Sequence, residues 1–155
     1  MEKKPNIGII GNGFVGSAIA HGFSLWAKVR IYDKNQKIST HSIRDVVEKS
    51  EIIFVCVPTP MDVSNKNKID LTILDSVMKE IYNYNDNYAQ NSGVVVIKST
   101  VTPGTTKKYE NLYPSMRIVF NPEFLSERTA KLDFNNPSRI ILGGDWKAIE
   151  PVEKL

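Results

Sequence analysis

The sequence contains few residues that could form a disulfide or bind a metal ion: one cysteine and two histidines among 155 residues. The single cysteine, Cys56, cannot form an internal disulfide, and no spacing among these three residues resembles a zinc site. The longest unbroken apolar run, residues 52–57, is far too short to cross a bilayer. The first residues also lack the apolar core of a secretion signal, so we expect a reducing, cytoplasmic location and no metal.

Charge of one sign is also lacking. The 20 Lys and Arg residues and 17 Asp and Glu residues leave a net charge of +3, and the basic residues are scattered along the chain. Such a pattern is typical of a solvated surface and argues against a nucleic-acid interface. With 41% hydrophobic and 24% charged residues, the composition is that of a soluble globular protein. We therefore predict one domain over residues 1–155, with no membrane or nucleic-acid partner.

Short β-rich runs alternate with amphipathic helical patterns along the whole chain. The runs are continuously apolar, as in strands that are buried on both faces. Helix starts are expected at Asp70 and at Thr102, which is followed by proline. Two asparagine-rich stretches, residues 64–68 and 83–92, are expected to be loops. This alternation predicts an α/β fold of the Rossmann type: a doubly wound, mostly parallel sheet between two helical layers. The expected strands are residues 7–10, 29–32, 52–57, 94–97, 118–120 and 140–142.

A glycine motif lies between the first expected strand and the first expected helix. This context makes G-x-G-x-x-G a dinucleotide fingerprint, because its glycines allow a tight turn, close approach of a pyrophosphate and close helix packing. The N–H groups at the helix N-terminus then face the phosphates. The alternative is a glycine-rich turn without a ligand. The predicted phosphate-binding residues are Gly11, Asn12, Gly13, Phe14, Val15 and Gly16.

An acidic residue follows the second expected strand, 22 residues after Gly11. At this place a carboxylate accepts the ribose hydroxyls of NAD and repels the 2′-phosphate of NADP, so Asp33 predicts NAD as the cofactor. Lys34 and Lys37 follow closely and suit a solvated loop. Lys37 is also a candidate cofactor contact, which would soften that repulsion.

Four further strings occur in a fixed order along the chain. They are Val-Cys-Val-Pro-Thr-Pro at 55–60, Lys-Ser-Thr-Val-Thr-Pro-Gly-Thr at 98–105, Asn-Pro-Glu-Phe-Leu-Ser-Glu at 121–127 and Asn-Pro-Ser-Arg-Ile-Ile-Leu-Gly-Gly at 136–144. With the glycine motif they resemble the N-terminal domain of the UDP-glucose/GDP-mannose 6-dehydrogenase family, over residues 7–145. Members of that family oxidise C6 of a nucleotide-linked hexose twice, from alcohol to acid, and reduce two NAD.

The resemblance implies a role for each matching position. Thr59 resembles a cofactor contact beside the nicotinamide ribose, and Thr100 resembles the threonine that contacts NAD and holds a catalytic water. Glu123 resembles the carboxylate proposed as acid/base, and Glu127 one that lies between the sugar and the nicotinamide. The backbone that would line the sugar pocket belongs to Phe124, Leu125 and Ser126.

The residues themselves support part of this assignment. All of them follow the ends of expected strands, at the edge where open α/β sheets bind ligands. If Asn121 caps a short helix, Glu123 and Glu127 face the same side of it. Alternatively, Glu123 is an acid in the first turn that is favoured by the helix dipole. Cys56 is expected to be an inert core thiol.

The chain departs from the family pattern in three ways. The family's central helical region and its C-terminal domain with the nucleophilic cysteine are absent, the stretch from Asp33 to Glu51 is short, and Arg128 stands where glycine is common. We expect the chain to bind a dinucleotide, to bind a nucleotide sugar weakly and not to complete turnover. Homo-oligomers are an expectation for full-length members only. The alternatives are a β-hydroxy-acid dehydrogenase domain and a non-catalytic dinucleotide-binding module.

Overall fold

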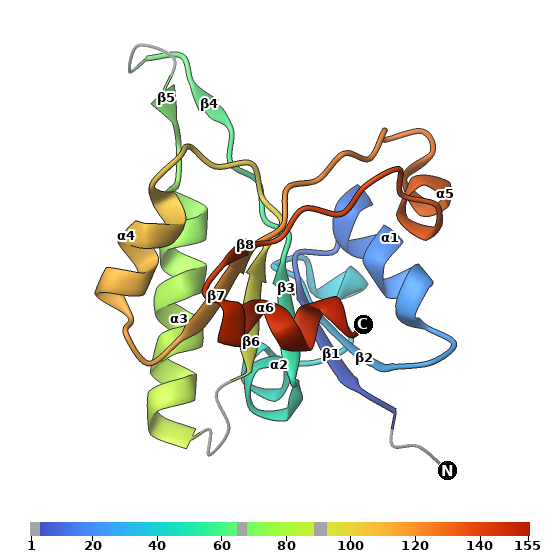
Figure 1. Cartoon of the computed structure of the whole chain (residues 1–155), viewed down its shortest axis with the longest axis horizontal. Helices are drawn as coiled ribbons and strands as arrows, with labels where there is room; N and C mark the ends of the chain where they lie inside the picture. The colour runs from blue at the N-terminus through green and yellow to red at the C-terminus, as the bar shows by residue number, and fades with distance from the viewer. Residues whose placement is uncertain (1–3, 65–67, 89–92) are drawn as a thin grey trace.

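The computed structural model describes residues 4–64, 68–88 and 93–155, which form three layers around one six-stranded sheet (Figure 1). The strand order is β2-β1-β3-β6-β7-β8. All pairings among the first five strands are parallel, and β8 pairs with β7 in the antiparallel direction. The predicted doubly wound, mostly parallel sheet is confirmed. Its strands are β1 (Asn6–Ile10), β2 (Lys28–Tyr32), β3 (Ile52–Val55), β6 (Val94–Ile97), β7 (Arg117–Phe120) and β8 (Gly143–Gly144).

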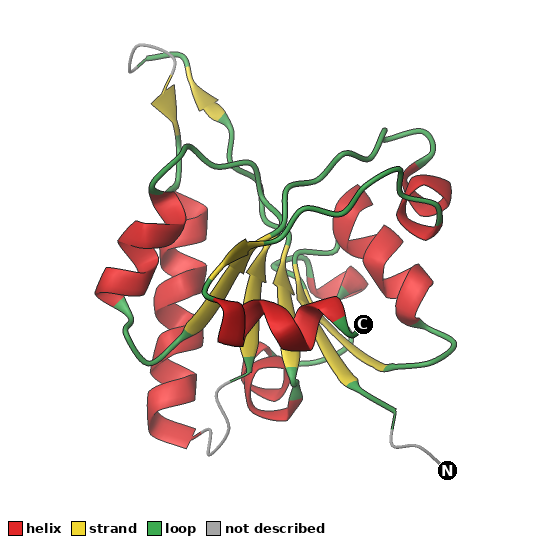
Figure 2. Cartoon of the chain, in the orientation of Figure 1, coloured by secondary structure: helices red, strands yellow, loops and turns green. Residues whose placement is uncertain are grey.

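Helices cover both faces of the sheet, as Figure 2 shows in red against the yellow strands. One face carries α1 (Phe14–Phe23), α5 (Ala130–Asn135) and α6 (Trp146–Glu153), whose apolar side chains pack with those of one core cluster. The other face carries α2 (Ile43–Lys49), α3 (Thr72–Tyr88) and α4 (Thr105–Leu112), which pack into a second cluster. The fully buried pattern of β3 and β6 follows, because each strand contributes side chains to both clusters.

The order of the strands indicates which edge of the sheet can bind a ligand. From β1 the chain passes to β2 on one side and then to β3 on the other, so the strand order reverses between β1 and β3. In open α/β sheets the crevice for ligands lies at such a reversal, outside the carboxyl ends of the strands. The segments after β1, β3, β6 and β7 therefore gather at one edge, where the glycine motif and the residues after 56, 97 and 120 lie (Figure 1).

Two helix boundaries differ from the sequence expectation. Helix α4 begins at Thr105 and not after Thr102, because Gly104 adopts a left-handed conformation with φ 91° that interrupts a helix started earlier. Helix α3 begins at Thr72, and the Asp70 carboxylate accepts a hydrogen bond from the Thr72 N–H at 2.8 Å. Asp70 thus accepts a hydrogen bond from the first N–H of the helix, but it lies one position before the N-cap and not, as expected, at the N-cap itself.

Both expected loops and the last expected strand also need correction. Residues 83–88 continue α3, because Tyr84 still packs against the core cluster of that face. Residues 65–67 and 89–92 of the expected loops lie outside the described residues, and Lys68 belongs to β5 (Lys68–Ile69), which pairs with β4 (Met61–Asp62) in a small hairpin. Residues 140–142 form no strand; the pairing with β7 is made by Gly143 and Gly144 instead.

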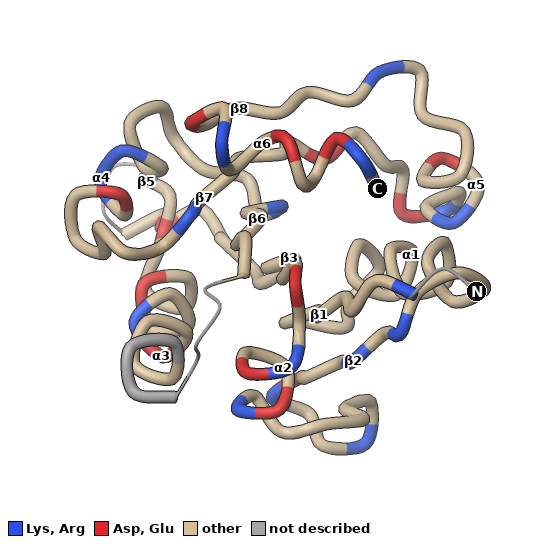
Figure 3. The backbone as a smooth tube through the Cα atoms, turned by 60° about the horizontal axis from the view of Figure 1, so that its bottom comes forward, with Lys and Arg blue, Asp and Glu red and all other residues tan. Residues whose placement is uncertain are grey.

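Basic and acidic residues are interspersed over the described chain, as Figure 3 shows, in agreement with the scattered charge of the sequence. The same view places α1 and α6 on one side of the strands and α2 and α3 on the other. Among the described residues, no helix combines the length and the apolar character that crossing a bilayer requires.

Candidate functional site

The glycine turn between β1 and α1 is built by close backbone contacts. Gly11 has φ 95° and donates its N–H to the carbonyl of Tyr32 at 2.9 Å, and a Cβ there would lie 2.6 Å from the carbonyl oxygen of Cys56. A Cβ at Gly16 would lie 1.9 Å from the carbonyl oxygen of Gly11. Both positions therefore require glycine, one for the turn and one for the packing of α1 on the turn, as predicted.

Gly13 differs from its two neighbours because it faces open space. It is the N-cap of α1, makes no side-chain cap hydrogen bond, and a Cβ placed there would have no atom within 4 Å. The first N–H groups of a helix have no partner within the helix, so they are available to an anion that approaches at this point. The space beside Gly13 and the free helix N-terminus fit a pyrophosphate group.

Asp33 lies directly after β2 and binds the glycine turn itself. Its Oδ2 accepts the N–H of Asn12 at 2.6 Å, and its Oδ1 accepts the N–H of Asn35 at 2.7 Å. Each carboxylate oxygen can accept a second hydrogen bond, so the group can still receive a ribose hydroxyl. The tie to the turn was not predicted from the sequence, because it links residues 21 positions apart.

The short segment after Asp33 also rests on the glycine turn. The Asn12 side chain donates from Nδ2 to the carbonyl of Ile38 at 2.8 Å, and its buried Oδ1 has no hydrogen-bond partner among the described residues. Ile38 ends η1 (Gln36–Ile38), a single 3₁₀ turn in which Lys37 is exposed. Lys37 is thus free to reach a ligand beside the turn, and its role as a cofactor contact stays a prediction.

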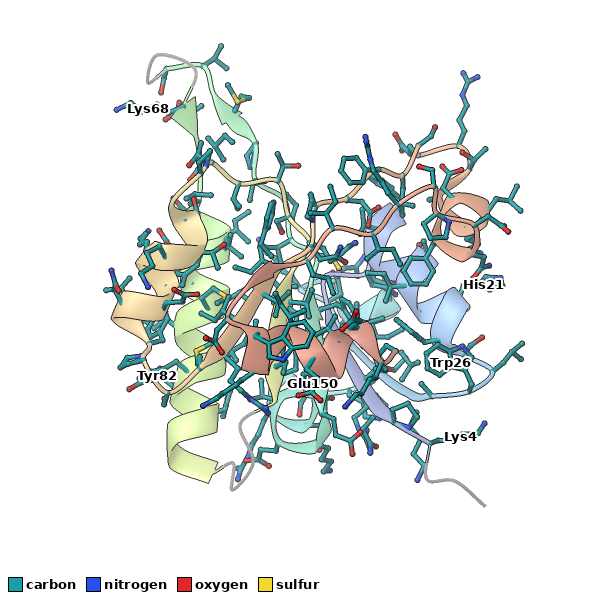
Figure 4. The ribbon with its side chains drawn as sticks, in the orientation of Figure 1. Lys4, His21, Trp26, Lys68, Tyr82 and Glu150 are labelled. Atoms are coloured by element: carbon teal, nitrogen blue, oxygen red, sulfur yellow. The ribbon has the colours of Figure 1, made fainter. Side chains whose placement is uncertain are left out.

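We expect Asp33→Ala to weaken NAD binding by about 1–3 kcal/mol, or roughly fivefold to 150-fold. The variant removes an acceptor for the ribose and also frees the N–H of Asn12 in the phosphate turn. Calorimetric titration with NAD measures the effect. Glu150→Ala is the matched control, because Glu150 is an exposed carboxylate on α6 (Figure 4) that pairs with Lys154. An unchanged NAD affinity in Asp33→Ala would show that Asp33 does not contribute to NAD binding.

The segments after β3 and β6 are joined by side-chain hydrogen bonds. Thr59 donates from Oγ1 to the carbonyl of Thr100 at 2.7 Å, and Ser99 donates from Oγ to the carbonyl of Val57 at 2.7 Å. Both segments leave the carboxyl ends of neighbouring parallel strands, so they lie side by side at the ligand edge. The structure thus brings Thr59 and Thr100 together, as the resemblance implied.

The helix expected over residues 121–127 does not exist, since α5 begins only at Ala130. The Glu123 side chain folds back instead, and its Oε1 accepts the N–H groups of Phe124 at 2.8 Å and Leu125 at 3.2 Å. These bonds hold the backbone in a turn that is not helical. The expectation that Glu123 and Glu127 share one helix face is therefore wrong: Glu123 is mostly buried, and Glu127 is exposed.

The Glu123 carboxylate is paired with a buried lysine that sequence reasoning missed. The Lys98 ammonium lies 2.8 Å from Glu123 Oε2 and donates to Asn121 Oδ1 at 2.9 Å. Lys98 directly follows the apolar run of β6, and a charged residue at the end of such a buried strand was a signal for this role.

The rest of the expected sugar loop is more open. The Phe124 ring is exposed and carries the Arg139 guanidinium 4.8 Å above its centroid, and the Ser126 N–H donates to Asp133 at 2.9 Å. Glu127 lines a cavity of about 230 Å³. Helix α1 contributes Phe14 and Ser17 to the wall of that cavity, so Glu127 lies beside the helix whose N-terminus faces the expected phosphates. Arg128 lines the same cavity and is exposed.

A larger cavity of about 600 Å³ lies on the face of the sheet that carries α1 and α6. Aromatic rings of Phe23, Trp26, Phe54 and Phe134 form part of its wall. Lys98 and the segment that follows β7 also line it, so the cation of the buried ion pair borders this cavity. The residues that line the cavity do not include the glycine turn.

The only thiol of the chain does not suit nucleophilic chemistry. Burial raises the pKa of Cys56 to about 12, and the charges of Lys98 and Glu123 act on it with opposite signs. His21 lies on the outer side of α1 (Figure 4), and His41 Nδ1 lies 2.8 Å from the hydroxyl of its neighbour Thr40.

Comparison with known proteins agrees with this geometry. The model of the UDP-glucose/GDP-mannose dehydrogenase family, NAD binding domain, matches residues 28–154. A UDP-glucose 6-dehydrogenase of Streptococcus pneumoniae is 30% identical over an alignment of 167 positions, gaps included. The alignment covers 90% of this chain and 41% of that protein. A UDP-glucose dehydrogenase structure from Pyrobaculum islandicum has a TM-score of 0.83 at 25% identity. The superposition covers 97% of this chain and 43% of the chain in that structure.

A GDP-mannose dehydrogenase structure from Pseudomonas aeruginosa has a TM-score of 0.84 at 23% identity, which shows a shared fold. The superposition covers 96% of this chain and 43% of the chain in that structure. The chain thus spans less than half the length of these relatives. The family match begins at the first residue of β2, so the glycine turn precedes it and is supported by its own geometry. Because the match covers most of the chain, this protein belongs to the UDP-glucose/GDP-mannose dehydrogenase family and corresponds to its NAD-binding domain.

Proposed function

We propose that the chain is the NAD-binding part of a nucleotide-sugar 6-dehydrogenase, which oxidises C6 of a UDP- or GDP-hexose to the uronic acid. The observation that carries this proposal is the glycine turn. It is open at Gly13, closed by backbone contacts at Gly11 and Gly16, and tied to Asp33. The family of the chain and the fold of its relatives support the same reading over a β-hydroxy-acid dehydrogenase or a non-catalytic module.

The cofactor would lie along the ligand edge of the sheet. The turn from Gly11 to Gly16 holds the pyrophosphate, Asp33 holds a ribose, and Lys37 lies within the exposed segment beside it. Thr59, Thr100 and Glu127 contact the nicotinamide half. Bound NAD supplies the hydride acceptor, and the residues of this chain orient it and exclude water from one side.

The nucleotide sugar would lie against the segment that follows β7. The backbone of Phe124, Leu125 and Ser126 lines the hexose, and Glu123 and Thr100 hold the water and the proton of the reacting alcohol. Acid formation through a thioester requires an exposed, activated thiol. Since the Cys56 thiol is half-buried and its pKa is raised to about 12, that step needs a nucleophile from a further domain or chain. A reducing cytoplasm is the proposed location, because the one thiol forms no disulfide.

A ligand panel tests the proposal. At a hundredfold excess over Kd, NAD stabilises the folded chain by about 2.7 kcal/mol, which gives a clear upward shift in Tm. We expect NADP to bind at least about tenfold more weakly than NAD, because the Asp33 carboxylate repels a 2′-phosphate. UDP-glucose and GDP-mannose should give small shifts, since one domain leaves most of the sugar exposed to water. Equal affinity for NAD and NADP would contradict the assignment of Asp33.

A further inference from the structure

Lys98 is a charged residue in an unusually buried place. Its side chain is 6% exposed, and its ammonium group contacts two neighbours from the segment after β7. Nζ lies 2.8 Å from Glu123 Oε2 and donates to Asn121 Oδ1 at 2.9 Å. Asn121 in turn donates from Nδ2 to the carbonyl of Ile141 at 2.8 Å. The ammonium therefore joins the end of β6 to the segment after β7, and Asn121 extends the link to the segment that precedes β8.

The Glu123 carboxylate transmits this anchoring to the backbone. One oxygen faces Lys98, and the other accepts the N–H groups of Phe124 and Leu125. The conformation of the segment thus depends on where the carboxylate lies, and the position of the carboxylate depends on Lys98. Asn121 sets the position of the ammonium group, so the three side chains form one unit.

The position of the Glu123 carboxylate depends on the charge of Lys98 and not only on its size. The Glu123 side chain is 13% exposed, and a carboxylate at such a depth is costly unless a cation pairs with it. An uncharged side chain of similar length at position 98 would fill the space and leave the carboxylate unpaired. Glu123 would then turn toward water and release the N–H groups of Phe124 and Leu125.

We propose that Lys98 is a positioning residue for the nucleotide-sugar site: together with Asn121 it holds the Glu123 carboxylate, and through it the backbone of residues 123–125, in the conformation that receives the sugar. This role rests on the proposed function, because that function assigns the sugar to this segment. It does not involve the glycine turn, which Asp33 and β2 hold separately.

Amide hydrogen exchange, followed by NMR on the whole chain, tests the anchoring directly. In Lys98→Met we expect the amides of Phe124 and Leu125 to exchange about tenfold faster or more than in the wild type, while amides of β1 and β3 change little. Lys98→Arg keeps the cation and should restore exchange to within about threefold of the wild type. Lys108→Met is the matched control, because Lys108 pairs with Asp75 on α4 and α3, on the opposite face.

A local effect separates positioning from general stability, because global unfolding would accelerate all core amides equally. If Lys98→Met does not fold, the double variant with Lys98→Met and Glu123→Gln removes both charges. The exchange rates of the Phe124 and Leu125 amides are then compared with the wild type in that variant. Unchanged exchange at Phe124 and Leu125 in the folded variant, or equal acceleration throughout the sheet, would overturn the proposal.

The binding arm distinguishes this proposal from the function on which it rests. With NAD present, UDP-glucose should shift the amide signals of residues 124–126 in the wild type and shift them less in Lys98→Met, whereas NAD affinity stays equal. If UDP-glucose and GDP-mannose leave these signals unchanged in the wild type, the assigned substrate is wrong. The exchange measurement still decides whether Lys98 holds the segment.

Discussion

Gly16→Ala should lower the free energy of unfolding by about 3 kcal/mol or more, the upper range for inserting a methyl group into a tightly packed place. The added Cβ would lie 1.9 Å from the carbonyl oxygen of Gly11 and 3.2 Å from a methyl group of Ile9. The first contact is with a backbone atom of the turn, which no side-chain movement can relieve, so α1 must move away from the turn. Urea denaturation, followed by circular dichroism, measures the loss.

Gly13→Ala is the matched variant in the same motif, with the opposite expectation. Gly13 has φ −73° and ψ −161°, which alanine adopts readily, and its added Cβ would meet no atom within 4 Å. Stability should therefore stay within about 0.5 kcal/mol of the wild type, the usual range for a change at an open surface position. The methyl group occupies the space beside the helix N-terminus, so NAD affinity should fall at least about tenfold.

The pair of variants separates folding from binding within one motif. Urea denaturation and calorimetric titration with NAD are carried out on both proteins. A Gly16→Ala protein as stable as the wild type would show that the close approach of α1 to the turn is wrong. A Gly13→Ala protein that binds NAD normally would show that the pyrophosphate does not lie at this helix N-terminus.

Cys56 should react with a thiol reagent about thirtyfold more slowly in the folded chain than in the unfolded chain, because the thiolate is rarer although it is more nucleophilic. Burial raises its pKa from 9.0 to about 12, so the reactive thiolate is correspondingly rarer near neutral pH. The rate in the folded chain should increase about tenfold for each unit of pH until the thiol titrates. Because the folded state holds the proton more tightly, the neutral thiol contributes its full stability below pH 9, and this contribution declines between pH 9 and about 12.

Absorbance of a disulfide reagent, added with and without guanidinium chloride, gives both rates. The Cys56→Ser protein is the blank for each condition. Rapid reaction of the folded chain would mean that the Cys56 thiol is activated, against the raised pKa that its surroundings give it. An NADH assay with UDP-glucose or GDP-mannose tests the consequence. Sustained formation of two NADH per sugar, also in Cys56→Ser, would refute the view that acid formation needs a nucleophile from outside this chain.

Much of the fold was accessible from local patterns. Residues 7–10 and 94–97 are continuously apolar and form β1 and β6, because only strands buried on both faces tolerate such runs. The glycine motif was also readable, since Gly11 and Gly16 meet steric demands that the turn itself creates, whereas Gly13 leaves open space beside the helix N-terminus. Asp33 could be located by its distance along the chain from Gly11, because one βαβ unit sets that distance.

Errors arose where a side chain made a contact that the local sequence does not contain. Residues 121–127 carry a helix-start pattern, yet Glu123 binds its own backbone and a lysine 25 positions earlier, and no helix forms there. Thr102 precedes a proline, as a helix cap does, but the left-handed Gly104 delays α4 to Thr105. At residues 121–127 a short-range preference of less than about 1 kcal/mol was outweighed by these contacts, whereas the delay of α4 comes from the backbone conformation of one glycine.

The amino-acid sequence by itself determined the class of the fold, the phosphate-binding turn and the acid at the end of β2, because each depends on residues near one another in the chain. Only the tertiary structure decided that Asp33 ties the turn, that Thr59 and Thr100 share a hydrogen bond, and that Lys98 holds Glu123. These contacts join residues from 21 to 41 positions apart. Parallel strand pairing brings them to one edge, and a sequence read along its length does not contain that pairing.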